Sequence, residues 1–364
     1  MKILIGMLVY NEEEVISQTL SSLYKQDIFT NNEYEVEIII VANGCWDDTV
    51  KIANKSLANF TLKTPIEYKV IDKQEPGKVA AWNDLVHKYS NGNEKYIIFM
   101  DGDIVIQESD NLSTLVKSLE VKTDALISTD QPIKDIELQK SNSLSSKLSC
   151  SFSGITRKGS SQLCGQLYCA RASFIKEIYI PPEILIDDTY IKFMACTKGL
   201  TQPVDHSKIV NNLYISHVFE AYTGLKDYFN NQVRQTVGFS LWRIFKEIIN
   251  DDLKHSNAIE IVNNNRLRDP DWLQKEMYKY FTKNNKKWFI YKGALRVRFD
   301  RLSRLSLTGK LKMFFPSIAA WLIDLAVYTI ANRKIKNKHI QDLWPDTKSK
   351  KLGALNRPLT NIQN

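Results

Sequence analysis

The sequence lacks the cysteine pattern of a disulfide framework or of a zinc site. Its five cysteines are an odd number, and no two of them are arranged as CxxC. This usage is typical of a protein in a reducing cytoplasm. The N-terminal apolar run, residues 2–9, is also followed by no small-residue cleavage site. We therefore interpret it as a buried first strand and not as a signal peptide.

Two nucleotide-binding motifs are missing as well. No GxGxxG follows the first predicted strand, and no GxxxxGK[ST] occurs in the 364 residues. The first absence argues against a dinucleotide-dependent oxidoreductase and the second against a P-loop nucleotide triphosphatase. With 43% hydrophobic and 25% charged residues, the chain can bury a sizeable core in one large or two modest domains.

The positive charge is concentrated at the C-terminal end. The net charge is +8; residues 301–364 hold twelve Lys or Arg against three acids, and the first 300 residues hold 37 basic and 38 acidic groups. A nearly neutral body argues against nucleic-acid binding, whereas a basic tail favours an anionic surface such as lipid headgroups. A solvated basic tail is the alternative.

Apolar runs of strand length alternate with helical stretches along the first hundred residues. The predicted strands cover residues 2–9, 36–42, 67–71 and 95–100, and the predicted helices cover 15–24, 49–58 and 78–88. Repeated strand-helix-strand units predict an α/β fold with a mostly parallel, Rossmann-like sheet covered by helices on both faces. Ligands of such sheets bind outside the carboxyl ends of the strands, so the polar residues that follow each strand are the first candidates for a site.

Two later segments have unusual compositions. Residues 141–161 include nine serines, which predicts either a mobile loop beside the site or a plain surface insertion. Residues 313–331 carry a single charge, Asp324, between basic flanks. They are long enough to span a bilayer, but Pro316 and the Asp324 carboxylate favour a helix that lies in the membrane interface. A spanning helix and a docked core helix are the alternatives.

The segment Asp101-Gly102-Asp103 follows the fourth predicted strand. Two carboxylates around Gly102, which permits a tight turn, favour shared binding of a hard divalent cation, Mg²⁺ or Mn²⁺. Such an ion would offset the negative charge of a departing diphosphate. A surface turn is the alternative. His217 is a candidate for a further metal ligand through a ring nitrogen, and a hydrogen-bonded core histidine is its alternative.

Three more polar motifs precede this one. They are Tyr10-Asn11-Glu12-Glu13, Ala42-Asn43-Gly44-Cys45-Trp46-Asp47-Asp48-Thr49 and Gly77-Lys78-Val79-Ala80-Ala81-Trp82-Asn83. In this order, the four motifs resemble the nucleotide-binding half of glycosyltransferase family 2, which has a GT-A fold. The resemblance implies that a nucleotide-sugar donor and its metal contact the matching residues, namely Tyr10, Asn11, Glu12 and Asn43 at the base and ribose, Lys78 near the diphosphate, Asp101 with Gly102 at the ribose or metal, and Asp103 at the metal.

One of these positions, Asn43, departs from the family, and another, Asn11, has a second interpretation. The family usually has two acids where this chain reads Ala42-Asn43. This departure leaves the base of the donor undetermined by the sequence, and UDP is the nucleotide that the resemblance favours. Asn11 and Glu14 have the spacing of a capping box, in which case Asn11 would only cap the helix that follows it.

A second acidic motif, Asp187-Asp188-Thr189, leads into a helical stretch. It resembles the family's Glu-Asp acceptor motif, which implies that Asp187 lies at the acceptor and that Asp188 is the general base. The neighbouring charge of Asp187 would raise the pKa of that base. Gly165 resembles the family's support of the acceptor pocket, and Arg234 falls where processive members have an arginine that contacts the diphosphate. Alternatively, the two acids only cap the start of the helix, and Arg234 is only a surface residue of a helix.

Together, these features predict an inverting, metal-dependent hexosyl- or N-acetylhexosaminyltransferase. It would move a sugar from a nucleotide sugar to a glycan or lipid-linked acceptor in bacterial surface polysaccharide synthesis, at the cytoplasmic face of the cell membrane. We expect a GT-A domain at residues 1–222, with its donor half at 1–110 and its acceptor half at 111–222, and a helical, basic, membrane-associating region at 223–364. The alternatives are a haloacid-dehalogenase-type phosphatase with Asp101 as nucleophile and a non-catalytic scaffold of a polysaccharide assembly complex.

Overall fold

The computed structural model describes residues 1–138, 163–221, 225–283 and 287–337. The serine-rich segment 141–161, the predicted domain boundary at 222 and the end of the basic tail lie outside these residues.

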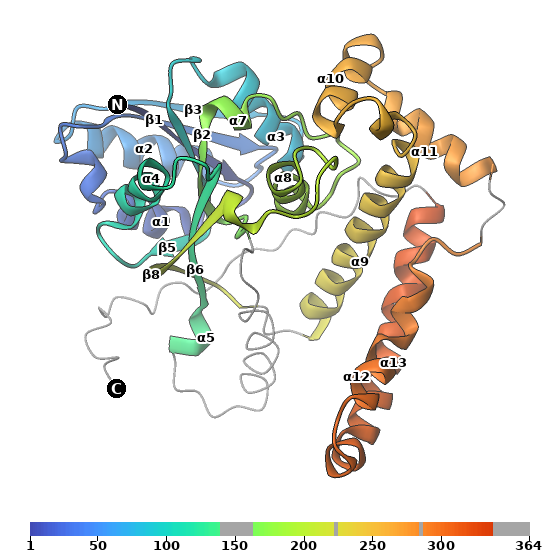
Figure 1. Cartoon of the computed structure of the whole chain (residues 1–364). Helices are drawn as coiled ribbons and strands as arrows, with labels where there is room; N and C mark the ends of the chain where they lie inside the picture. Colours follow the sequence, from blue (N-terminus) through green and yellow to red (C-terminus); the bar gives the residue numbers. More distant parts are fainter. Residues whose placement is uncertain (139–162, 222–224, 284–286, 338–364) are drawn as a thin grey trace.

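The described chain begins with alternating strands and helices and ends with helices alone (Figure 1). The first part contains β1 (Lys2–Val9), α1 (Ile16–Leu23), η1 (Asp27–Phe29), β2 (Glu35–Asn43), α2 (Thr49–Thr61), β3 (Glu67–Lys73), α3 (Lys78–Asp84), the π-helical turn η2 (Leu85–Tyr89) and β4 (Tyr96–Asp101). The middle contains β5 (Ile104–Ile106), α4 (Asn111–Val121), β6 (Ile127–Lys134), α5 (Asp135–Leu138), β7 (Leu167–Arg171), α7 (Ala172–Ile175), α8 (Asp187–Cys196), η3 (His206–Lys208) and β8 (Ile209–Phe219). The last part contains α9 (Leu225–Ile248), η4 (Asp252–Lys254), α10 (Ala258–Arg268), α11 (Trp272–Lys283), η5 (Lys292–Arg296), α12 (Val297–Ser303) and α13 (Leu307–Lys336).

The strands form one eight-stranded sheet in the order β3-β2-β1-β4-β7-β6-β8-β5. The four predicted strands form its parallel half, β3-β2-β1-β4. In the other half β7 is antiparallel to β4 and β6, and β5 is antiparallel to β8. The predicted α/β fold is therefore confirmed, with a sheet that is parallel from β3 to β4 and mixed beyond β4. The order reverses at β1, so the region outside the carboxyl ends of β1 and β4 is the expected place for a ligand.

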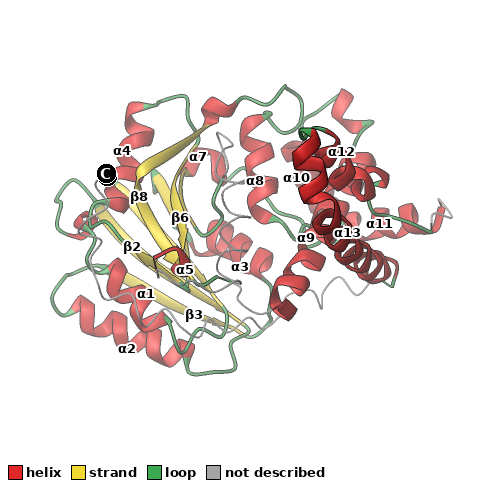
Figure 2. Ribbon diagram, turned by 90° about the horizontal axis from the view of Figure 1, so that it is seen from below, coloured by secondary structure: helices red, strands yellow, loops and turns green. Residues whose placement is uncertain are grey.

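Helices cover both faces of the sheet, as the continuous apolar strands require. Along β1, Ile3, Ile5 and Met7 belong to one buried core and Leu4 and Leu8 to the other, because successive side chains point to opposite faces. Figures 1 and 2 show α1, α2 and α4 on one face, α3 and α8 on the other, and α9 to α13 as an outer layer beyond α8.

The helix predicted at 313–331 is longer than expected and differs between its two ends. Among the described residues, α13 is the one helix long and apolar enough to cross a membrane. Its C-terminal half docks on the body: Val327, Ala331 and Ile335 are buried in the same core as α9. Its N-terminal half packs beside α12 and projects away from the sheet (Figure 1). The single acid of the apolar stretch, Asp324, is held by Arg298 of α12, with Nη2 2.8 Å from Oδ1.

Candidate active site

The turn after β1 is bound to the loop after β2. Asn11 has a φ of 54°, a left-handed conformation that asparagine tolerates better than most residues. Its backbone N–H donates to Cys45 Sγ over 3.3 Å, and its Oδ1 accepts the Trp46 N–H over 3.1 Å. The predicted capping box does not form, because α1 begins only at Ile16 and the Asn11 side chain is bonded to the loop after β2.

Glu12 is buried at the centre of a group of acids. Glu12 is only 9% exposed, and its Oε2 has no hydrogen-bond partner among the described residues. Burial and then the nearby carboxylates of Asp103, Asp101 and Asp47 raise the pKa of Glu12 to about 10. A buried carboxyl group next to three partly exposed ones is unfavourable in the protein alone and favours a cation.

Gly102 is required for close approach. A Cβ there would lie 2.5 Å from Val9 Cγ1 and 3.6 Å from Glu12 Cγ. The Thr19 hydroxyl donates to the Gly102 carbonyl over 2.8 Å. The Asp101-Gly102-Asp103 turn is therefore seated directly against the turn after β1, at the predicted edge of the sheet. The tight turn expected of Gly102 needs no positive φ, since this glycine is outside that region.

Asn43 joins three segments through its side chain. Its Nδ2 donates to the Val9 carbonyl over 3.1 Å, and its Oδ1 accepts the Gly77 N–H over 2.7 Å. Gly77, at φ 149°, immediately precedes α3 and so places Lys78 in the first turn of that helix. Contact of Asn43 with the base or ribose remains a prediction.

Lys78 lies between the acid at the end of β4 and the acids at the start of α8. Its Nζ is 3.0 Å from Asp101 Oδ1 and 3.8 Å from Asp187 Oδ2. Burial disfavours its charge, but the carboxylates of Asp101 and Asp187 outweigh burial and raise the pKa of Lys78. Burial also raises the pKa of Asp101 to about 6, although Lys78 opposes that shift. The lysine is thus a fixed positive charge between two acids that were predicted to serve different substrates.

Asp187 and Asp188 occupy the first turn of α8, whose preceding residue is Ile186. Neither acid is the N-cap, and a helix N-terminus stabilises negative charge. The Thr189 N–H donates to Asp188 Oδ1 over 2.6 Å. Burial and then the charge of Asp187 raise the pKa of Asp188, against the effects of the Thr189 N–H and Lys78.

Two close contacts support this acid pair. A Cβ on Gly165 would lie 3.0 Å from Asp188 Cβ, so the segment before β7 abuts the predicted base. A Cβ on Gly238 of α9 would lie 2.6 Å from Ile186 Cγ2. Arg234 lies one helical turn before Gly238, on the same side of α9. It is half-buried and donates to Asn231 Oδ1 over 3.3 Å.

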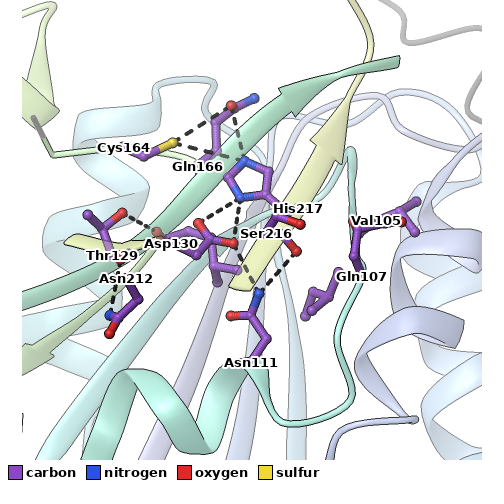
Figure 3. Close-up of polar contacts among 12 residues, drawn as sticks. Val105, Gln107, Asn111, Thr129, Asp130, Cys164, Gln166, Asn212, Ser216 and His217 are labelled. Carbon is purple, nitrogen blue, oxygen red and sulfur yellow. Dashed lines mark hydrogen bonds and ion pairs between the residues drawn. The ribbon is translucent and has the colours of Figure 1, made fainter. Parts of the chain in front are cut away.

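His217 is buried between β5 and β6 and is bonded to protein at both ring nitrogens (Figure 3). Nδ1 is 2.8 Å from Asp130 Oδ1, and Nε2 is 3.3 Å from Gln166 Oε1. Burial lowers the basicity of the ring, but the Asp130 carboxylate raises the pKa of His217 to about 10. Asp130 and the Gln166 side chain were missed by the sequence analysis, because the strand Ile127–Lys134 is largely polar and gives an acid within it no distinctive pattern. The metal-ligand role of His217 remains a prediction.

Comparison with known proteins gives a family and a fold. The model of glycosyl transferase family 2 matches residues 4–170, and no curated protein matches the sequence. A mannosyltransferase from Pyrobaculum calidifontis, solved with GDP-Man and Mn²⁺, has a TM-score of 0.52 at 13% identity, covering 94% of this chain and 87% of that chain. This likeness shows a shared fold.

Two further solved structures are similar at lower TM-scores. S. aureus TarS 1–349 in complex with UDP has a TM-score of 0.42 at 13% identity, covering 94% of this chain and 92% of that chain. Glucosyl-3-phosphoglycerate synthase from Mycobacterium tuberculosis, with Mn²⁺, UDP and glucosyl-3-phosphoglycerate, has 0.43 at 14% identity, covering 66% and 78%. The family match favours a glycosyltransferase over the phosphatase and the scaffold. Residues 4–170 therefore match the model of glycosyl transferase family 2, the chain shares the fold of a solved mannosyltransferase, and both findings support a glycosyltransferase.

Proposed function

We propose that this enzyme transfers a sugar, with inversion, from a metal-bound nucleotide sugar to a hydroxyl of a glycan or lipid-linked acceptor. UDP is the favoured nucleotide. The observation that carries the proposal is the position of Lys78, which contacts Asp101 on the donor side and Asp187 on the acceptor side. A donor diphosphate beside this lysine would lie within reach of an acceptor bound at Asp188.

The residues at the end of β4 fit a divalent cation. Within the described residues, no three His, Cys, Asp or Glu side chains gather into a ready metal site. Mg²⁺ and Mn²⁺ with nucleotides need fewer protein ligands, because phosphate oxygens and water complete the shell. Asp101 and Asp103 would hold the ion, and the unpaired Oε2 of Glu12 supports a cation nearby. The ion would offset the charge that develops on the leaving diphosphate.

Asp188 would act as the general base. Its carboxylate would take the proton of the acceptor hydroxyl while that oxygen forms a bond to the anomeric carbon and the bond from that carbon to the diphosphate breaks. The Thr189 N–H fixes the orientation of one carboxylate oxygen. The raised pKa of Asp188 makes it a stronger base than an exposed aspartate, which favours proton transfer near neutral pH.

Two substitutions separate binding from chemistry. We expect Asp103→Ala to abolish Mn²⁺-dependent binding of nucleotide, and Asp188→Asn to retain that binding and lose turnover by roughly 10²- to 10⁴-fold. Calorimetry with UDP and Mn²⁺ measures the first effect, and transfer from a radiolabelled nucleotide sugar measures the second. Near-wild-type turnover of Asp188→Asn would refute the assignment of the base.

We also propose that the hairpin of α12 and α13 lies on an anionic membrane, at the cytoplasmic face. Large apolar side chains are exposed on its projecting half, including Leu307 (76%), Leu311 (72%) and Phe315 (77%). The pairing of Arg298 with Asp324 removes the main obstacle to insertion, because it neutralises the only charge of residues 313–331. The basic residues Lys310 and Lys312 lie beside this apolar surface and match anionic headgroups.

A further inference from the structure

A buried ion pair joins two strands behind the active site. Asp130 of β6 is 1% exposed and His217 of β8 is 0% exposed. The pairing of these strands changes register between Thr129 and Gln131, at Asp130 itself. Such irregularities turn a side chain away from its regular direction. Here the carboxylate is directed at the imidazole, with Nδ1 2.8 Å from Oδ1 and 2.9 Å from Oδ2.

The pair is fixed on both sides, as Figure 3 shows. Asn111, at the start of α4, donates from Nδ2 to Asp130 Oδ2 over 3.1 Å and to the Ser216 carbonyl over 3.1 Å. On the other side of the ring, Nε2 faces Gln166 Oε1 at 3.3 Å and Cys164 Sγ at 3.9 Å. Because Asp130 accepts the Nδ1 proton, the ring is held with Nε2 toward residues 164–166.

Residues 164–166 lie between the two acids of the proposed reaction. The Gln166 carbonyl accepts the backbone N–H of Asp101 over 2.9 Å. Gly165 packs tightly against the predicted base, since a Cβ there would lie 3.0 Å from Asp188 Cβ. A movement of this segment would therefore shift Asp101, Asp188 or both.

We propose that the Asp130–His217 pair is a positioning device that, through Gln166, sets the spacing between Asp101 and Asp188. The inference rests on the proposed function, because it assigns these acids to donor and acceptor. His217 touches no reactant in this role. Misplacement of reacting groups by about 1 Å can cost roughly 10²-fold in rate, so a device that acts at this scale has a measurable effect.

Two substitutions at His217 keep different halves of its contacts. Asparagine places an amide near the position of Nδ1 and can keep the bond to Asp130, whereas glutamine reaches the position of Nε2 and can keep the bond to Gln166. We expect His217→Asn to lower kcat by about 10- to 100-fold, with the donor KM and the Mn²⁺ affinity within about twofold, and His217→Gln to lose less. His255→Asn, at an exposed histidine, is the matched control.

A second variant tests the proposal even if the His217 variants do not fold, and a second measurement tests it without an activity assay. Gln166→Met removes the acceptor of the Nε2 proton and leaves the Asp130–His217 pair intact, and we expect the same fall in kcat. Hydrogen exchange of the Asp101 amide reports whether Gln166 is held, and we expect at least a tenfold acceleration in His217→Asn and Gln166→Met.

The outcomes distinguish this proposal from its alternatives. A larger loss of kcat in His217→Gln than in His217→Asn would show that turnover depends on the bond to Asp130 and not on the contact with Gln166, and it would overturn the proposal. A parallel fall in Mn²⁺ affinity in both variants would make His217 a metal ligand and also overturn it. If the wild-type protein transfers no sugar, the proposed function fails, and unchanged Asp101 exchange in Gln166→Met would still refute the positioning role by itself.

Discussion

Replacement of Glu12 by glutamine should stabilise the metal-free protein, although it removes a predicted donor contact. Glu12 has an ordinary pKa of 4.5, and burial among Asp103, Asp101 and Asp47 raises it to about 10 in the folded protein. A carboxyl group whose pKa is raised on folding costs stability above its unfolded pKa, by about 1.4 kcal/mol per pH unit. At pH 7 the cost is about 3 kcal/mol. Glutamine keeps the shape, carries no charge and can donate to the neighbouring carboxylates.

The assay is thermal unfolding in EDTA at several pH values. We expect Glu12→Gln to melt about 5 °C above the wild type at pH 7, and the difference to vanish near pH 4.5 and to widen as the pH rises. Saturating Mn²⁺ and UDP should reduce the difference, because a nearby cation favours the charged form of Glu12 in the wild type. Glu14→Gln, at an exposed position, is the control. A difference that is independent of pH would refute the reasoning.

Two further predictions concern the base and the membrane. Burial raises the pKa of Asp188, and a general base must be deprotonated to act. We therefore expect kcat/KM, measured at saturating Mn²⁺, to fall as the pH is lowered through a pKa above the ordinary aspartate value. A fall that begins only at about pH 4 would contradict the burial argument. The double variant Leu311→Ser/Phe315→Ser should no longer float with phosphatidylglycerol vesicles. The control is Leu62→Ser, which changes a similarly exposed leucine on the body and should leave flotation unchanged. Unchanged flotation of the double variant would place the membrane contact elsewhere.

The donor half of the fold was predictable because its signals are local. β1, β2 and β4 contain apolar runs, and a helix follows each of β1, β2 and β3, so the parallel order needs no information from distant residues. The four polar motifs come together because carboxyl ends of parallel strands meet at one edge. Asn11 shows the limit of such signals: its spacing to Glu14 matches a cap, but its φ of 54° directs the side chain to Trp46.

The acceptor half was less predictable because its contacts are distant in sequence. Asp130 and His217 are 87 residues apart, and neither has a local pattern that implies the other. Their meeting depends on the parallel pairing of β6 with β8 and on the irregularity at Asp130. Likewise, the approach of Gly238 to Ile186 depends on the packing of α9 against α8. Register and packing of this kind are set by the whole core and not by a motif.

The departure from the family at Asn43 has a physical reason in this chain. The side chain must donate to the Val9 carbonyl and accept from the Gly77 N–H at once. An amide can do both, whereas an ionised aspartate has no proton to donate and would place a charged oxygen about 3 Å from a carbonyl oxygen in a buried position. The asparagine therefore stabilises the join between β1, β2 and the start of α3. Because that join places Lys78 at the start of α3, Asn43 also supports the position of the lysine beside Asp101.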